Sequence, residues 1–177
     1  MTALALLIVA GCATRPAAPT TPPAEAPAKH SIMAGDKAPS FDLPRIDGRG
    51  SIVVPTGRPT LVMLWGFHWG GQRAMSGLQR LHERWAPKGL DVVAVSHDEP
   101  WDELVKVAVD HGVTYPIAWD TSHRVVERYG PGHVMSIYLV DRAGVVRFTR
   151  ATGKESDPTA DPSVEEAIAS LLAQPAR

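Results

Sequence analysis

The chain has 177 residues, of which 44% are hydrophobic, and its 18 basic and 19 acidic side chains give a formal net charge of -1. This balance does not supply the basic surface that a nucleic-acid backbone requires, so no nucleic-acid partner is expected. The single cysteine, Cys12, excludes a disulfide within one copy of the chain.

The first predicted element is a signal segment at the N-terminus. The apolar run of residues 3–10 is too short to span a bilayer as a helix and has the length of the hydrophobic region of a signal peptide. Val9-Ala10-Gly11-Cys12 resembles a bacterial lipobox, although no Lys or Arg precedes the run. We therefore expect residues 1–12 to be a lipoprotein signal peptide and Cys12 to carry a lipid anchor to the membrane. The alternative is a buried N-terminal strand with an inert cysteine.

A linker is predicted next, at residues 13–32. Proline and alanine dominate residues 14–29, and such a composition cannot bury a core. It is expected to be a disordered tether for a domain in the bacterial cell envelope, facing the periplasm or the exterior. The remaining residues, 33–177, are enough for one compact domain with a single core.

Turn and helix-ending residues at regular intervals predict the elements of this domain. Two short extended segments, 41–43 and 52–54, flank the turn dipeptide Asp47-Gly48 and predict a β-hairpin. The continuous apolar run of residues 60–65 has the length of a strand that is covered on both faces. Leu78, Leu81 and Trp85 then recur at helical spacing, and Pro87 with Gly89 ends that pattern.

Strands and helices continue to alternate toward the C-terminus. Further strands are expected at residues 90–95, 116–119, 134–140 and 145–148, and further helices at 101–108, 125–129 and 164–172. Asp98 and Asp120 are the expected capping residues of the helices that follow them. The order indicates an α/β sandwich with a mixed sheet.

Four stretches resemble the landmarks of one family. They are residues 35–43 (GDKAPSFDL), 61–65 (LVMLW), 90–96 (LDVVAVS) and 136–144 (SIYLVDRAG). In order and spacing they are similar to thioredoxin-like proteins of the TlpA and redoxin group, which is peroxiredoxin-like (AhpC/TSA). The resemblance spans about residues 33 to 151. It implies a thioredoxin-like three-layer sandwich with an N-terminal β-hairpin extension, and no cofactor.

The resemblance also implies where chemistry would occur. Members of the group carry a reactive cysteine or a C-x-x-C pair between the first central strand and its helix, where a helix N-terminus lowers the pKa of a thiol. Aligned on Trp65, the two cysteine positions are occupied by Trp69 and Gln72, and the cis-proline position by Met135. Aligning on Leu78 shifts the register by about one residue and yields no thiol either. No catalytic residue is therefore expected.

The same region is a candidate ligand or partner site. Its residues are Phe67, His68, Trp69, Gly70, Gly71, Gln72, His133 and Met135. Exposed aromatic residues dominate interface energetics, so an envelope protein is an expected partner at this face. The alternative is that Trp69 folds inward over the site.

Two histidines suggest a metal as a further alternative. In a thioredoxin-like fold the loops of His68 and His133 face each other, and with Met135 or His97 they would bind copper or zinc. Residues 133–139 (HVMSIYL) are similar to Sco-type copper chaperones, whose two site cysteines are missing here. The simpler interpretation is a pair of ordinary loop histidines and no cofactor.

Other motifs add little to this list of candidates. Residues 96–99 (SHDE) are expected to be a solvated strand end, with Asp98 capping the next helix. No G-x-S-x-G, H-E-x-x-H or P-loop pattern occurs in the chain. The leading hypothesis is a membrane-tethered, thioredoxin-like lipoprotein without dithiol activity, acting as a binding or scaffolding module. The alternatives are a TlpA/redoxin-type thiol-disulfide oxidoreductase or peroxidase-like protein, and copper or zinc binding.

Overall fold

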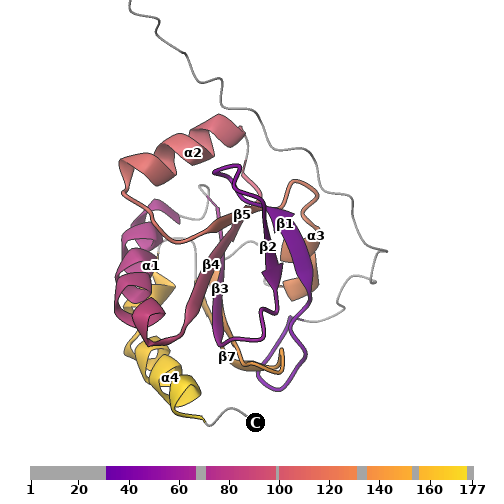
Figure 1. The fold of residues 1–177 in the computed structure, drawn as a ribbon, viewed down its shortest axis with the longest axis vertical. Coiled ribbons are helices and arrows are strands. Elements are labelled where there is room, and N and C mark those ends of the chain that lie inside the picture. The colour runs from indigo at the N-terminus through magenta and orange to yellow at the C-terminus, as the bar shows by residue number, and fades with distance from the viewer. Residues whose placement is uncertain (1–30, 67–70, 99, 131–134, 153–155, 175–177) are drawn as a thin grey trace, which may run out of the picture.

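The protein is built on a five-stranded mixed sheet with helices beside it (Figure 1). The computed structural model describes residues 31–66, 71–98, 100–130, 135–152 and 156–174. In spatial order the strands are β5 (Ile117–Trp119), β4 (Asp91–Ser96), β3 (Thr60–Trp65), β6 (Met135–Val140) and β7 (Val146–Thr152). Strands β3, β4 and β5 are parallel, β6 is antiparallel to β3, and β7 is antiparallel to β6. The predicted mixed sheet is confirmed.

Helices cover the sheet where the sequence periodicity predicted them. The helices are α1 (Gly71–Trp85), α2 (Trp101–Asp110), α3 (Arg124–Tyr129) and α4 (Pro162–Ala173), with short 3-10 helices η2 (Ala86–Lys88) and η3 (Pro158–Ala160). The predicted stripe of α1 is buried, with Leu78 1%, Leu81 3% and Trp85 9% exposed. Among the described helices, none is long and apolar enough to cross a membrane.

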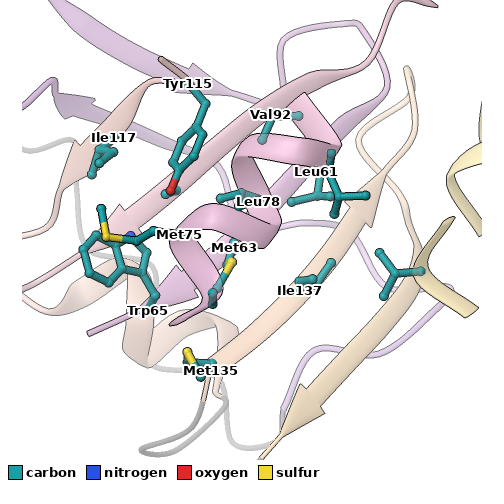
Figure 2. Close-up of a cluster of buried hydrophobic side chains, with 14 of the residues drawn as sticks. Leu61, Met63, Trp65, Met75, Leu78, Val92, Tyr115, Ile117, Met135 and Ile137 are labelled. Atoms are coloured by element: carbon teal, nitrogen blue, oxygen red, sulfur yellow. The ribbon is translucent and has the colours of Figure 1, made fainter. Parts of the chain in front are cut away.

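Alternation along β3 divides the core into two apolar clusters. Leu61, Met63 and Trp65 belong to the cluster on the side of α1, α2 and α4, part of which is shown in Figure 2. Val62 and Leu64 belong to the cluster on the opposite face. Successive strand side chains point to opposite faces, so a continuous apolar run is needed for a strand that is covered on both sides. The prediction that this strand is buried on both faces is confirmed.

A β-hairpin covers the second face together with α3 (Figure 1). Strand β1 (Phe41–Pro44) pairs antiparallel with β2 (Ser51–Val54), and Phe41 lies opposite Val54. Just after β1, Arg45 forms an isolated antiparallel bridge with Ala118 of β5. The predicted N-terminal hairpin extension and the three-layer arrangement are both confirmed.

Candidate functional site

The ends of four strands meet at one edge of the sheet. The register aligns Trp65 of β3 with Ser96 of β4, and Ser96 with Trp119 of β5. Because β6 runs antiparallel to β3, its first residue, Met135, lies at the same edge. The last residues of β3, β4 and β5 and the first residue of β6 are therefore neighbours here. This strand-end edge is where the sequence placed the candidate site.

Most of the predicted site residues lie outside the described residues. Cys12, Phe67, His68, Trp69, Gly70 and His133 all belong to this group. Gly71 is the first residue of α1, and Gln72 is in its first turn. Met135 begins β6 and is 1% exposed. The proposed meeting of His68 and His133 thus remains a prediction.

An apolar layer closes the core at this edge. Trp65, Met75 and Met135 are each only 1% exposed and belong to the same cluster. Figure 2 shows Met75 of α1 against the indole of Trp65, with Met135 at the start of β6. The layer joins the end of β3 to α1 and β6, the elements that flank the predicted loop. Its side chains provide packing and no acid, base or thiol.

A buried polar turn follows β4 and corrects one prediction. The Ser96 hydroxyl donates to Asp98 Oδ2 over 2.8 Å, and the Asp98 N–H donates to Ser96 Oγ over 3.2 Å. The Trp119 indole N–H donates to the Asp98 carbonyl over 3.2 Å. Ser96 is 0% exposed and Asp98 6%, so the expectation of a solvated strand end is wrong. The N-cap of α2 is Pro100 and not Asp98, which bonds within its own turn instead.

Asp120, at the end of β5, performs the capping that the sequence predicted. Its side chain is fully buried, and Oδ2 accepts the backbone N–H groups of Val125 over 2.8 Å and Val126 over 3.0 Å. These are donors of the first turn of α3, which have no partner within the helix. The residue at the N-cap itself is His123, whose side chain makes no capping bond. Asp120 therefore ties the first turn of α3 to the end of β5, although it is not the N-cap residue itself.

A pair of histidine rings at this edge was not predicted. The rings of His97 and His123 have centroids 4.6 Å apart and planes at 53°. His123 has a left-handed backbone with φ of 59°, which turns the chain into α3. Each histidine follows the end of a parallel strand, and that shared position is the sequence signal that would have suggested their proximity. The described residues contain no group of three or more His, Cys, Asp or Glu side chains arranged to hold a metal ion.

Comparison with known proteins gives this geometry a context. The profile of the AhpC/TSA family matches residues 34–149. The thiol-disulfide oxidoreductase ResA of Geobacillus thermodenitrificans is 29% identical over 122 residues, covering 67% of this chain and 70% of ResA.

Two solved structures share the fold at low sequence identity. AhpC of Mycobacterium tuberculosis has a TM-score of 0.68 at 15% identity, covering 81% of this chain and 94% of AhpC. Peroxidoxin BcpB of the same organism has a TM-score of 0.65 at 19% identity, covering 81% of this chain and 99% of BcpB. The predicted thioredoxin-like fold is confirmed, whereas the local similarity to Sco-type copper chaperones around His133 stays a prediction.

Proposed function

This chain belongs to the AhpC/TSA family, and from that premise we propose that it is a thioredoxin-like binding module of the bacterial cell envelope with no thiol redox activity of its own. One observation carries the proposal: Cys12 is the only cysteine, so residues 13–177 contain no thiol. Thiol–disulfide exchange starts with the attack of a thiolate, so a domain without one keeps the fold and loses that reaction.

The strand-end edge supports this proposal through the chemistry of its described side chains. Trp65 and Met135 fill the edge with apolar groups. The Ser96 hydroxyl is fully buried and bonded to the Asp98 carboxylate, so it is not accessible to a substrate. An activated nucleophile needs both access to the substrate and an adjacent base. Phe67 and Trp69, which follow Trp65 in the sequence, then suit recognition of a partner protein better than catalysis.

Reductase and peroxidase assays on the full chain test the absence of thiol chemistry. We expect insulin reduction by dithiothreitol and hydrogen peroxide consumption to proceed at the rate of the protein-free blank. The double variant Trp69→Cys/Gln72→Cys is the matched positive control, because it places a C-x-x-C pair at the positions that the family resemblance assigns. Turnover by the native chain above the protein-free blank would overturn the proposal. In that case a thiol-independent mechanism, or a thiol from a partner, would have to be sought.

The membrane anchor is a separate part of the proposal. Its support is the short apolar run that ends in Val9-Ala10-Gly11-Cys12, followed by a linker rich in proline and alanine. Expressed in a bacterial host, the native chain is expected in the membrane fraction and the Cys12→Ser variant in the soluble fraction. Equal partitioning of the two proteins would rule out the lipid anchor.

Copper or zinc binding is a second candidate, favoured by the ring pair of His97 and His123. The family resemblance leads us to expect His68 and His133 near that ring pair, and imidazole suits both metals. Metal content after dialysis against limiting copper or zinc should then fall in His133→Ala and in His97→Ala. Equal metal content in both variants and the native chain would remove this candidate.

A further inference from the structure

A surface cavity lies beside the first half of β4, away from the strand-end edge. Its volume is about 400 Å³, which is within the range of small-molecule pockets. Strand β5 pairs with β4 only from Ala94 onward, and Pro116, just before β5, lines part of the cavity. The other walls come from α1 and from the β1–β2 hairpin, which lie on opposite sides of the sheet (Figure 1). The cavity is therefore bounded by side chains from both layers around the sheet.

The middle of this cavity is apolar. Val92 and Val93 of β4 line it and are only 2% and 3% exposed, so they form a closed floor that offers a ligand no backbone group. Val53 of β2 lines it as well and is 53% exposed, which is unusual for a large apolar side chain of this domain. An alkyl segment lying over Val53 would remove this apolar surface from water.

Arg58, in the loop between β2 and β3, marks one end of the cavity. Its Nη1 lies 3.2 Å from Asp91 Oδ1 at the start of β4. The Thr56 hydroxyl donates to the other carboxylate oxygen, Asp91 Oδ2, over 3.0 Å. The Arg58 side chain is nevertheless 57% exposed, and its Nε and Nη2 have no hydrogen bond to any residue that the structure describes. A guanidinium has five donors, so Arg58 has donors left for a ligand.

Arg45, directly after β1, marks the other end. Its backbone forms a bridge with Ala118 of β5, which in turn pairs with Val95 of β4. Its Nε and Nη2 both donate to the Asp47 carboxylate, over 2.9 and 2.6 Å, and this double bond pattern fixes the plane of the guanidinium. Nη1 is left without a hydrogen bond among the described residues. Arg45 therefore also presents a positioned donor group to the cavity that it lines.

The spacing of the two ends sets the length of a ligand that reaches both. Asp91 and Val95, the β4 positions that mark these ends, are about 13 Å apart at the rise of a parallel strand. A charge-assisted hydrogen bond of about 2.8 Å at each end leaves about 7 Å for the ligand. An extended chain gains about 1.2 Å per bond, so two carboxylates joined by a short alkyl chain span this length.

The charges that line the cavity favour an anion. They are carried by Arg45, Arg58 and Asp91 at neutral pH. His82 of α1 also lines the cavity, but burial lowers its pKa against the opposing effect of Glu83, so its imidazole is uncharged there. Because both oxygens of Asp91 are already engaged by Arg58 and Thr56, the donors that remain unused are cationic ones.

We propose that this cavity binds a small aliphatic dicarboxylate of about six to eight carbons, with one carboxylate on Arg58, the other on Arg45 and the alkyl chain over Val53. Acetate or phosphate would reach one arginine and leave the apolar middle uncovered. A ligand with two charged ends and an apolar middle uses all three features. This site is separate from the strand-end edge and does not depend on the proposed absence of thiol chemistry.

Backbone amide NMR of the full chain, at constant ionic strength, tests the proposal with heptanedioate as the probe. At millimolar concentration we expect saturating shifts at Arg45, Val53 and Arg58. Heptanoate has the same chain with one carboxylate, and butanedioate has two carboxylates that are too close together to reach both arginines. Each of these controls should need about a tenfold higher concentration for half-saturation, because one charge-assisted contact is lost.

Matched variants show whether both ends of the ligand are held. Arg58→Gln should raise the half-saturating concentration of heptanedioate about tenfold and remove its advantage over heptanoate. Arg49→Gln should change neither, because the Arg49 side chain is 83% exposed and lies outside the cavity. Equal half-saturating concentrations of heptanedioate and heptanoate in the native chain would overturn the proposal. So would the absence of saturation, or shifts confined to the strand-end edge at Trp65 and Trp119.

Discussion

Helix α1, which begins beside the candidate site, packs closely against η3 at Gly77. Gly77 of α1 faces η3, and a methyl group at this position would lie 1.8 Å from Thr159 Oγ1 and 3.0 Å from Thr159 Cβ. Thr159 is 8% exposed, and its hydroxyl donates to Asp157 Oδ1 over 2.6 Å. Gly77→Ala therefore forces either α1 or η3 to move.

The size of this effect follows from opposing terms. Alanine favours a helix interior over glycine by about 1 kcal/mol, which would stabilise the variant. Overpacking costs about 1 to 3 kcal/mol, and rotating Thr159 does not remove the clash because its Cβ is already at 3.0 Å. Displacing Thr159 also weakens its bond to Asp157, at about 1 kcal/mol. We expect a net destabilisation of about 2 kcal/mol, or a fall in Tm of about 4 to 8 °C.

Urea and thermal denaturation of Gly77→Ala measure this change. Ser76→Ala is the control, because Ser76 is the exposed neighbour in the same helix and should change stability by no more than about 0.5 kcal/mol. Adding Thr159→Gly to Gly77→Ala removes the clashing side chain and should recover part of the loss. A Gly77→Ala protein as stable as the native chain would refute the reasoning.

Three further predictions concern pH and capping. Burial tends to raise the pKa of Asp141, but the N–H of Val145 and the Arg147 guanidinium outweigh it and hold this pKa below its usual value. The stabilisation by Asp141 is therefore present above about pH 4 and is lost as the pH falls. In Asp141→Asn the urea midpoint should depend less on pH below that value than it does in the native chain. Burial lowers the pKa of His82 against the opposing effect of Glu83, so stability should decline as the pH falls below about 6.5, and less steeply in His82→Gln. Asp120→Ala should cost about 2 kcal/mol in urea unfolding through the two lost capping bonds to α3, and an unchanged midpoint would contradict that role.

Local patterns were sufficient to predict the elements of the fold. The strand at residues 60–65 and the helix with Leu78, Leu81 and Trp85 were found because apolar periodicity is a property of neighbouring residues. The Asp47-Gly48 turn likewise marked the hairpin, and Gly48 has the positive φ of 73° that such a turn uses. The order of the strands and their hydrogen-bonded register were not predicted and come from the structure.

Contacts between distant segments were not predictable in the same way. Nothing near Asp98 in the sequence indicates that Trp119 would donate to its carbonyl, or that Ser96 would hold its carboxylate. The ring pair of His97 and His123 depends on the alignment of β4 with β5. These features follow from how neighbouring strands are aligned with each other, and the spacing of residues along one strand does not determine that alignment.

The residues that hold the fold and those that would carry thiol chemistry occupy different parts of the chain. Both apolar clusters include alternate residues of β3, such as Leu61 and Val62, and burying each such side chain contributes about 1.5 to 3 kcal/mol. Thiol–disulfide exchange needs a thiolate, which the resemblance places after Trp65, whereas this burial is needed for folding. A chain can therefore belong to the AhpC/TSA family by its core and lack the family's cysteines. For the same reason, denaturation experiments measure the stability that the two apolar clusters provide. Whether the chain has thiol chemistry is measured by the reductase and peroxidase assays.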